Sequence, residues 1–499
     1  MMRSLYSGVS GLKVHQTKMD VIGNNISNVN TIGFKSSSVN FSDIFYQTTQ
    51  SASGANPLTG KAGTNARQIG LGSTVAGITA NMTTQGGSQR TDNALDIMIN
   101  GNAFFIVNSG GTNYFTKNGA FTTDGAGNLA TESGATVMGW KVDPENPNMV
   151  VKGNVSPIGI YTTENTYTEP EATTNTYFSG NIDQNDEDLV NGRVIQTEFY
   201  DNLGNKYTAK YKLVSQGTSD KNTYDVRVTD VLDADGQSIF VDATVQDGIT
   251  IYRPKNPMPS VTFGGRRYSV SVDTLTGQAT LNDYTYTNAN GNRVTQDADL
   301  TLTFNASTGK FVGIGYGANT DEAAVLSIDT GATGNTSSAN LFEDISVDFS
   351  ALTMYESSGN TSITSNRGER GTGKGAGTTK GKINGVSVSD TGKIFASYDN
   401  GSSKLLGQVA VATFTNPAGL EAVGNSMFQA TQNSGEFDGI GSDISENGDS
   451  FTTGVLEMSN VDLSSEFTSM ITTQRGFQAN SRIITTSDTL LEELINLKR

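Results

Sequence analysis

Three stretches of the sequence carry residues that could do chemistry. The single histidine, His15, could bind a metal or transfer a proton. The glycine-rich run GERGTGKG at 368–375 approaches a phosphate-binding P-loop. The acidic run DQNDEDL at 183–189 could hold calcium. Each of these chemistries needs particular residues nearby, so each can be checked against the sequence around it.

The required neighbours are missing in all three stretches. A metal or catalytic site at His15 would need partners that a chain with no cysteine and no second histidine does not offer. In the glycine-rich run, Lys374 takes the P-loop lysine position, but Gly375 replaces the Ser or Thr that would bind magnesium. An EF-hand needs Gly at its sixth position and Glu at its twelfth, where this chain has Asp188 and Val194. We therefore predict no catalytic, metal-binding or cofactor-binding residue and no enzymatic activity, with weak divalent binding at the acidic turn left as an alternative.

The strongest pattern lies at the two ends of the chain, where apolar residues recur every seven positions. Such a repeat forms one apolar stripe along a helix that can pack against another helix. It predicts helices over 2–28 and 461–497, the second with Ser459 or Asn460 as N-cap and Asp462 in its first turn. We expect both helices to lie together as a coiled-coil-like stalk with subunit-assembly seams. The stripe residues are Leu5, Leu12, Met19 and Ile26 at the start, and Leu463, Met470, Phe477, Ile484 and Leu491 at the end.

Neither helix is strong by itself. Glycines inside the first helix weaken it by roughly 1 kcal/mol each in isolation. The second seam position of the C-terminal helix is polar, which favours packing in a multi-subunit tube over a dimeric coiled coil. We expect both helices to become ordered on assembly. The residues concerned are Gly8, Gly11 and Gly23 in the first helix, and Gln474, Ser481 and Asp488 in the second.

The sequence between the helices is typical of short β-strands. It contains most of the 57 glycines, and regularly spaced Val, Ile, Tyr and Phe predict strands joined by tight turns. Asn100-Gly101, Asn118-Gly119 and Asp124-Gly125 are hairpin signals, and 194–214 is expected to share a sheet with 299–315. We predict a multi-domain chain with discontinuous β domains nested between paired terminal helices: a helical polymerisation domain (1–35 and 455–499), an extended arm (36–93), an inner β domain (94–150 and 366–454), a middle β domain (151–232 and 298–365) and an inserted outer β domain (233–297).

Charge and composition exclude several classes of protein. The net charge is −17, and residues 151–365 carry 27 acidic and 13 basic side chains, so most of the negative charge lies in the middle. Nucleic-acid binding is not expected without clustered Lys and Arg. No run approaches the roughly 20 apolar residues of a membrane span, and the first residues lack the apolar core of a signal peptide. We expect export, if it occurs, to use another route.

Both terminal segments resemble the signatures of the bacterial flagellar rod and hook proteins. The resemblance is carried by SGVSGLKVHQTKMDVIGNNISNVNTIGFK at the start and LEMSNVDLSSEFTSMITTQRGFQANSRIITTSDTLLEELINLKR at the end. VDFSALTMY, with Met354 where Gln is expected, and VATFTNPAGLEAVGNSMFQATQNSG resemble hook proteins in particular. The signature positions are Asn24, Asn25, Asn28, Gly33, Phe34, Ser459, Asn460, Val461, Asp462, Gln474, Arg475 and Asn480.

This resemblance implies a structural role. A hook protein would self-assemble into a curved hollow tube, a universal joint between motor and filament. Its partners would be copies of itself, the rod, the hook cap, the hook–filament junction proteins and the flagellar type III export apparatus, and it would lie outside the cell without a cleaved signal peptide. Two alternatives remain: a distal rod subunit, which would usually lack so large a middle region, and a secreted β-rich adhesin, which would leave the paired terminal heptads unexplained.

Overall fold

The chain folds into two compact units. Unit 1 comprises residues 1–166, 383–397 and 403–499, and unit 2 comprises residues 167–382 and 398–402. The computed structural model describes residues 2–54, 60, 62–217, 221–246, 249–288, 292–297, 299–316, 321–330 and 341–497.

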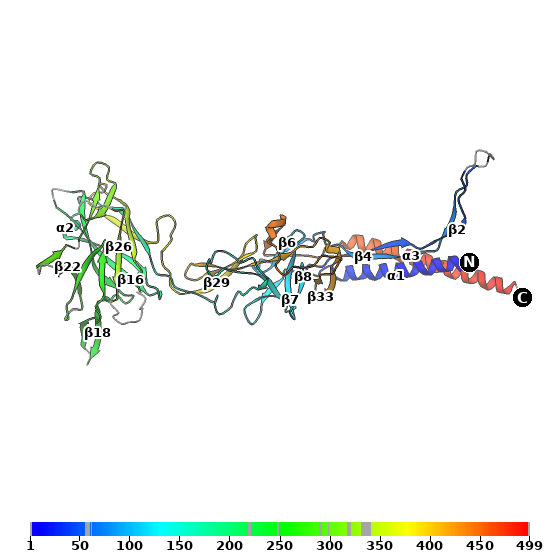
Figure 1. Ribbon diagram of the computed structural model, residues 1–499, viewed down its shortest axis with the longest axis horizontal. Coiled ribbons are helices and arrows are strands. Elements are labelled where there is room, and N and C mark those ends of the chain that lie inside the picture. Colours follow the sequence, from blue (N-terminus) through cyan, green and yellow to red (C-terminus); the bar gives the residue numbers. More distant parts are fainter. Residues whose placement is uncertain are drawn as a thin grey trace. The chain divides into compact units, whose positions relative to one another are not determined.

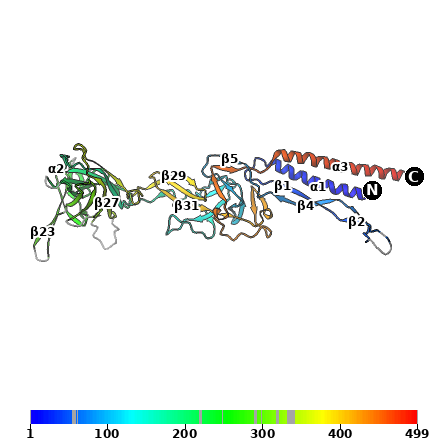
Figure 2. The same ribbon diagram turned by 90° about the horizontal axis from the view of Figure 1, so that it is seen from above.

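The two terminal helices of unit 1 lie side by side. Helix α1 (Met2–Ser27) and helix α3 (Leu463–Asn496) run antiparallel, with the N- and C-termini at the same end of the pair (Figures 1 and 2). This confirms the predicted association of both ends. The N-cap of α3 is Asp462, whose carboxylate accepts hydrogen bonds from the amides of Ser464 (2.9 Å) and Ser465 (3.4 Å). The predicted N-caps, Ser459 and Asn460, lie before the helix. Among the described residues, no helix is long and apolar enough to cross a membrane.

Two nested strand pairs follow α1, in the segment predicted to be an extended arm. Strand β1 (Ser37–Asp43) pairs with β4 (Ser73–Ala80) and packs near α1, and β2 (Tyr46–Gln50) pairs with β3 (Arg67–Gly70). Both views show the β2 hairpin leading away from the helices. Polar side chains alternate with few apolar ones here, so strand pairing between backbones, and not a buried face, defines these elements.

The β domain of unit 1 is closed by strands from both ends of the chain. Strand β5 (Ser88–Arg90) pairs with β36 (Val455–Glu457), and β6 (Ile97–Asn100) pairs with β35 (Ser450–Thr453). The hairpin predicted at Asn100-Gly101 is therefore wrong, because β6 takes a partner about 350 residues away. The signal at Asn118-Gly119 is also not a hairpin, whereas Asp124-Gly125 does join a paired β9 and β10.

The central sheet of unit 1 has the order β30-β31-β11-β7-β8-β34-β33. Its core contains Phe104, Ile106, Phe115, and Trp140, the single tryptophan, which is 2% exposed. The remaining elements are β7 (Phe104–Ser109), β8 (Thr112–Thr116), β9 (Phe121–Thr123), β10 (Leu129–Thr131), β11 (Thr136–Lys141), β12 (Ser156–Pro157), β30 (Lys393–Tyr398), β31 (Ser403–Val409), β32 (Val411–Ala412), β33 (Glu421–Gly424), β34 (Met427–Gln429), and the short 3₁₀ helices η1 (Pro417–Gly419) and η2 (Ile444–Asn447).

Unit 2 contains an eight-stranded sheet, a five-stranded sheet and a separate hairpin. The sheet orders are β23-β22-β21-β20-β26-β27-β14-β28 and β15-β16-β17-β24-β25, and β18 pairs with β19. The elements are β13 (Tyr167–Thr168), β14 (Asn175–Asn181), α2 (Asp188–Asn191), β15 (Arg193–Tyr200), β16 (Lys206–Ser215), β17 (Thr223–Leu232), β18 (Val241–Gln246), β19 (Ile249–Pro254), β20 (Ser260–Phe263), β21 (Arg266–Val272), β22 (Ala279–Thr287), β23 (Arg293–Gln296), β24 (Leu300–Phe304), β25 (Phe311–Gly315), β26 (Ala323–Asp329), β27 (Ile345–Thr353), β28 (Ser362–Arg367) and β29 (Gly381–Val388), which continues into unit 1.

One apolar core serves the whole of unit 2. The five-stranded sheet contains both 194–214 and 299–315, as predicted from their alternating patterns. The sequence suggested a separate outer domain over 233–297. In the structure β20 from that segment pairs with β26, and its Val261 and Phe263 are fully buried in the common core. The sequence does not show that this segment shares the common core, because β20 pairs with a strand that lies more than sixty residues later in the chain.

Candidate functional site: the paired terminal helices and their junction

Small residues form the contact face between the two helices. Gly8 and Gly11 of α1 face Asn480 of α3, and a Cβ atom at Gly11 would lie 2.7 Å from the Asn480 side-chain nitrogen. On α3, a Cβ atom at Gly476 would lie 2.7 Å from Nε2 of His15. A later position on α1 contacts an earlier position on α3, as expected for antiparallel helices. Gly8 and Gly11, two of the three glycines that weaken an isolated α1, are thus positions where α3 approaches closely, whereas nothing lies within 4 Å of a Cβ at Gly23.

The predicted stripes lie at the edge of this contact face. On α1, Leu5, Leu12, Met19 and Ile26 are all half-buried, whereas the buried positions are Gly8, Gly11, Val14, Ile22 and Asn25. On α3, the four residues from Met470 to Leu491 are half-buried and Leu463 is exposed, whereas Thr473 and Ser487 are buried. The buried polar residues Thr473 and Ser487 thus lie three residues after the stripe residues Met470 and Ile484. The sequence had placed the polar seam four residues after them, at Gln474 and Asp488, which are exposed.

Two asparagines of the terminal signatures fasten the helices to the strands beside them. The Asn25 side chain donates to the Ser37 carbonyl (2.8 Å) and to Oε1 of Glu466 (2.9 Å), and accepts from the Ser37 amide (3.0 Å). The Asn460 side chain accepts from the Ser36 amide (2.7 Å) and donates to the carbonyls of Asn81 (2.9 Å) and Thr84 (3.1 Å). Each amide satisfies several backbone groups at once, which no apolar residue of similar size could do.

A buried ion pair lies where the helices meet the β domain. Lys35 Nζ is 2.8 Å from Glu457 Oε1, and both side chains are at most 2% exposed. Lys35 also donates to the Thr84 carbonyl (2.8 Å), and Glu457 accepts from the Gly86 amide (2.9 Å). These extra hydrogen bonds compensate part of the desolvation cost of the charges. The pair joins residues 422 positions apart in sequence.

The surroundings of this pair are equally restrictive. Gly33 has a φ of +66°, donates its amide to the Glu457 carbonyl (2.8 Å), and leaves no room for a Cβ, which would lie 2.7 Å from the Asn118 amide nitrogen. Lys117 is 1% exposed and donates to the Gly101 carbonyl (2.7 Å). Burial lowers the pKa of Lys117 to about 8, an effect that Glu457 opposes. Lys35, Glu457 and Lys117 are not among the residues predicted from the sequence, although the first two lie inside the terminal signatures.

The remaining contacts of the signature residues lie around this junction and along α3. Asn24, Asn28, Gly33 and Phe34 line one cavity of about 400 Å³ together with 424–428. Asn480 donates to the Gly476 carbonyl (3.0 Å), while Gln474 and Arg475 are exposed on α3. Ser459 accepts from the Val461 amide (3.3 Å) and so shapes the approach to the helix.

The three stretches first considered for chemistry have structural roles. His15 is half-buried beside Phe41, and no group of three potential metal ligands occurs among the described residues. Asp183 accepts from the amides of Asn185 (2.9 Å), Ser357 (2.6 Å) and Gly359 (2.8 Å), which lowers its pKa. Its carboxylate is therefore already occupied by protein donors.

The neighbouring acidic and glycine-rich segments also lack the geometry of ligand sites. Asp186 pairs with Arg193 at 2.9 Å. The 368–375 run turns through glycines with positive φ, and no helix follows it as a P-loop would require.

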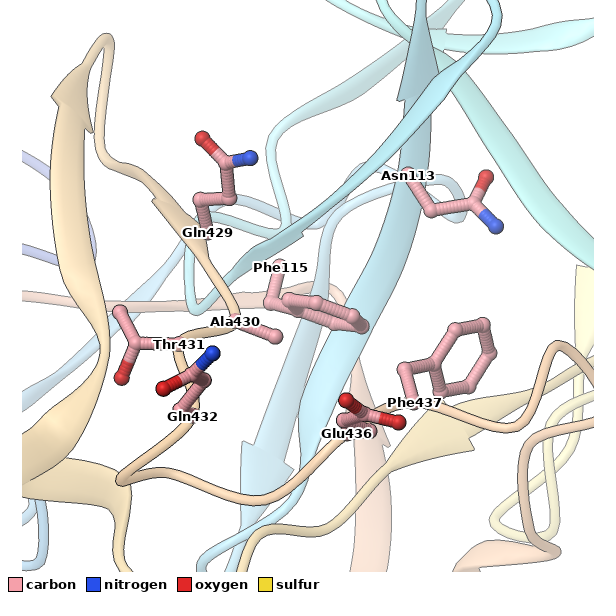
Figure 3. A pocket seen from close by; sticks show the side chains of 8 residues that line it. All are labelled: Asn113, Phe115, Gln429, Ala430, Thr431, Gln432, Glu436 and Phe437. Atoms are coloured by element: carbon pink, nitrogen blue, oxygen red, sulfur yellow. The ribbon is translucent and has the colours of Figure 1, made fainter.

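The β domain of unit 1 contains a hollow that does not involve the helices. It measures about 430 Å³ and is lined by Asn113, Phe115, Gln429, Ala430, Thr431, Gln432, Glu436 and Phe437. Figure 3 shows the two aromatic rings near one another, with amide side chains around them. The Phe115 ring packs against Phe437 at 5.3 Å and belongs to the core. Glu436 is the one ionisable residue of this lining, so the hollow offers no acid–base pair.

The close approach of the helices leads to a first prediction. Replacing Gly11 by Leu should force α1 and α3 apart and disorder both, because the side chain would occupy the place of the Asn480 amide. The matched variant Gly23→Leu should leave the pair intact or strengthen it, since nothing lies within 4 Å of a Cβ there and Leu is the better helix former. Under conditions in which the wild type assembles, far-ultraviolet circular dichroism should show a loss of helix for the first variant alone. Equal helix content in both would contradict the packing described.

The fold and the terminal segments define a class, the axial rod and hook proteins of the bacterial flagellum. Family models match at both ends and between them: "Flagella basal body rod protein" at 5–35, "Flagellar hook protein FlgE/F/G D1 domain" at 98–166 and "Flagellar basal body rod FlgEFG protein C-terminal" at 452–497. The chain is 33% identical to the flagellar hook protein FlgE of Borreliella burgdorferi and 31% identical to that of Treponema pallidum, each over the full length of both chains. This chain belongs to the flagellar hook protein FlgE family.

The comparison also separates hook from rod. The flagellar basal-body rod protein FlgG of Bacillus subtilis is 46% identical to this chain, but over 138 residues that cover 28% of the chain and 51% of FlgG. The likeness to the hook proteins continues through the whole middle region. The chain is thus a structural, non-enzymatic hook protein, as the sequence led us to expect.

Proposed function

We propose that this chain polymerises through its paired terminal helices into a curved hollow tube that acts as a universal joint between the flagellar rod and the filament. The observation that carries the proposal is the antiparallel α1–α3 pair, which is formed by the two ends of the chain and keeps large apolar side chains exposed. In this proposal residues 1–35 and 455–499 are the polymerisation domain, and the β domains face away from the tube's inner wall.

We further infer how the subunit reaches its place. It is a component of the flagellum outside the cell, and we propose that it passes through the flagellar type III export apparatus without a cleaved signal peptide. Its contacts would be with other copies, with the rod and hook cap during growth, and with the junction proteins at the distal end. A chain with no cysteine suits this route, because no disulfide has to form after export.

Negative-stain electron microscopy of the purified full chain at high concentration tests the proposal. Short curved tubes are the expected result. Monomers that never associate, over a wide range of concentration and salt, would contradict polymerisation. Binding of such monomers to a glycan array would favour the adhesin alternative, since an adhesin needs no polymer.

A second prediction concerns how the tube bends. The acidic excess lies in 151–365, so contacts between these regions of neighbouring copies should be weak and screened by salt. Raising ionic strength from roughly 0.01 to 1 M shortens the screening length from about 30 Å to about 3 Å. Tubes imaged across this range should change curvature or pitch before they dissociate. Direct dissociation with no change of shape would argue against an adjustable acidic surface.

A further inference from the structure

Helix α3 carries two apolar patches that nothing in the described part of the chain covers. The N-terminal patch consists of Leu463, Phe467 and Ile471, which are 38%, 50% and 59% exposed. The C-terminal patch consists of Ile483, Leu490 and Leu494, which are 44%, 47% and 49% exposed. Large apolar side chains grouped on a surface usually mark a site of protein contact.

The two patches lie on different flanks of the helix. At 100° per residue, Phe467 and Leu494 point about 180° apart around the helix axis, and Phe467 and Leu490 about 140° apart. Apart from Ala479, the exposed residues between the patches are polar and include Arg475, Gln478 and Arg482. The contact face toward α1, with buried Thr473 and Ser487, runs between the two flanks. One continuous stripe is therefore excluded, and the helix presents two separate surfaces.

The position of the patches along α3 specifies how two copies can meet. Their centres are about 20 residues apart, which is about 30 Å at a rise of 1.5 Å per residue. Copies in a helical polymer point in one direction and make head-to-tail contacts, in which two different surfaces of one subunit meet its two neighbours. A self-complementary contact, in which one patch meets the same patch, would close a dimer and stop growth.

We propose that the N-terminal patch of α3 packs against the C-terminal patch of α3 in a neighbouring copy that is shifted by about 30 Å along the helix. This deepens the proposed function by naming the two surfaces and their stagger. Each copy then uses both patches once, so each internal copy has both covered. Three side chains per patch bury too little area for a stable dimer. Single copies therefore stay monomeric until several subunits associate at once.

Cysteine cross-linking tests this pairing in a chain that has no cysteine of its own. In the double variant Ile471→Cys, Leu490→Cys, the two sites are about 28 Å apart on one straight helix, beyond the roughly 7 Å that a disulfide allows between Cα atoms. Any bond between them must therefore join two copies. Oxidised tubes should give a ladder of trimers and larger species on electrophoresis without reductant. Each single-cysteine variant should give no species above a dimer.

A matched control tests the stagger itself. Thr485 is exposed on α3 five residues before Leu490, so the double variant Thr485→Cys, Leu490→Cys should give a ladder only if neighbouring helices lie almost level. If that control forms the ladder and Ile471→Cys, Leu490→Cys does not, the proposal is overturned. Absence of any ladder from tubes seen by microscopy overturns it as well, while the tubes themselves keep polymerisation intact.

The experiment remains decisive if the double variant does not form tubes. Mixed tubes grown from the two single variants should contain dimers of one Ile471→Cys chain and one Leu490→Cys chain, which a mass tag on one variant identifies. Tubes grown from either variant alone should lack cross-linked dimers. Mixed tubes without the tagged pair would overturn the proposal.

Discussion

Replacing Lys35 alone by Met should lower the free energy of unfolding of unit 1 by about 3–5 kcal/mol, because it leaves the Glu457 carboxylate buried without its cation. Glu457→Leu alone should lower the free energy of unfolding by a comparable amount, because it leaves the Lys35 ammonium buried without its anion. The double variant Lys35→Met, Glu457→Leu should recover most of that loss, since apolar residues of similar volume can replace a buried pair at little cost. The two charges would then contribute more to specificity than to stability.

Trp140 makes this double-mutant cycle measurable. It is the single tryptophan, lies in the core of unit 1, and so reports denaturant unfolding of that unit without a signal from unit 2. The exposed pair Arg90–Asp92 provides the control, and Arg90→Met should leave the midpoint nearly unchanged. If Lys35→Met behaved like Arg90→Met, Lys35 and Glu457 could not be a desolvated pair in solution.

Phe477→Asp should abolish polymerisation while leaving the β sheets of both units folded. Phe477 is half-buried on the predicted stripe of α3, and a carboxylate there would lose part of its hydration. Such a loss costs several kcal/mol per subunit, and every subunit of a tube bears it. Sedimentation should find the variant in the supernatant under conditions that pellet wild-type tubes.

The next residue supplies the matched control for this substitution. Gln478 is exposed on the polar part of α3, so Gln478→Asp introduces the same charge without desolvation and should still polymerise. Loss of tubes in both variants would show that added charge on the helix, and not its position on the stripe, prevents assembly.

Local patterns predicted much of the fold. The strands within 194–214 were predictable because their side chains alternate and the turn between them is short, so that each partner strand lies next in sequence. The signal at Asn100-Gly101 failed because a better partner, β35, lies 350 residues away, where no local pattern can reveal it. The extent of the core of unit 2 was missed for the same reason, since β20 pairs with the distant β26.

The helix pair shows a different limit of sequence reasoning. The seven-residue repeat predicted that the ends associate, but helix propensity counts Gly8 and Gly11 as defects because it describes a helix alone in water. Against α3 the same residues allow close packing. The buried pair Lys35–Glu457 could not be predicted from the sequence. Each residue has the sequence surroundings of an ordinary surface charge, and its partner lies 422 positions away.

These end-to-end contacts also determine when unit 1 can fold. Asn25–Glu466, Lys35–Glu457 and Ser36–Asn460 each join residues more than 420 positions apart. Contacts of such high order form slowly and cannot begin before residues 457–466 have been synthesised. A nascent chain that has not reached these residues therefore has no α1–α3 pair to unfold, and a chaperone that held only the final forty residues would prevent α1 from packing against α3.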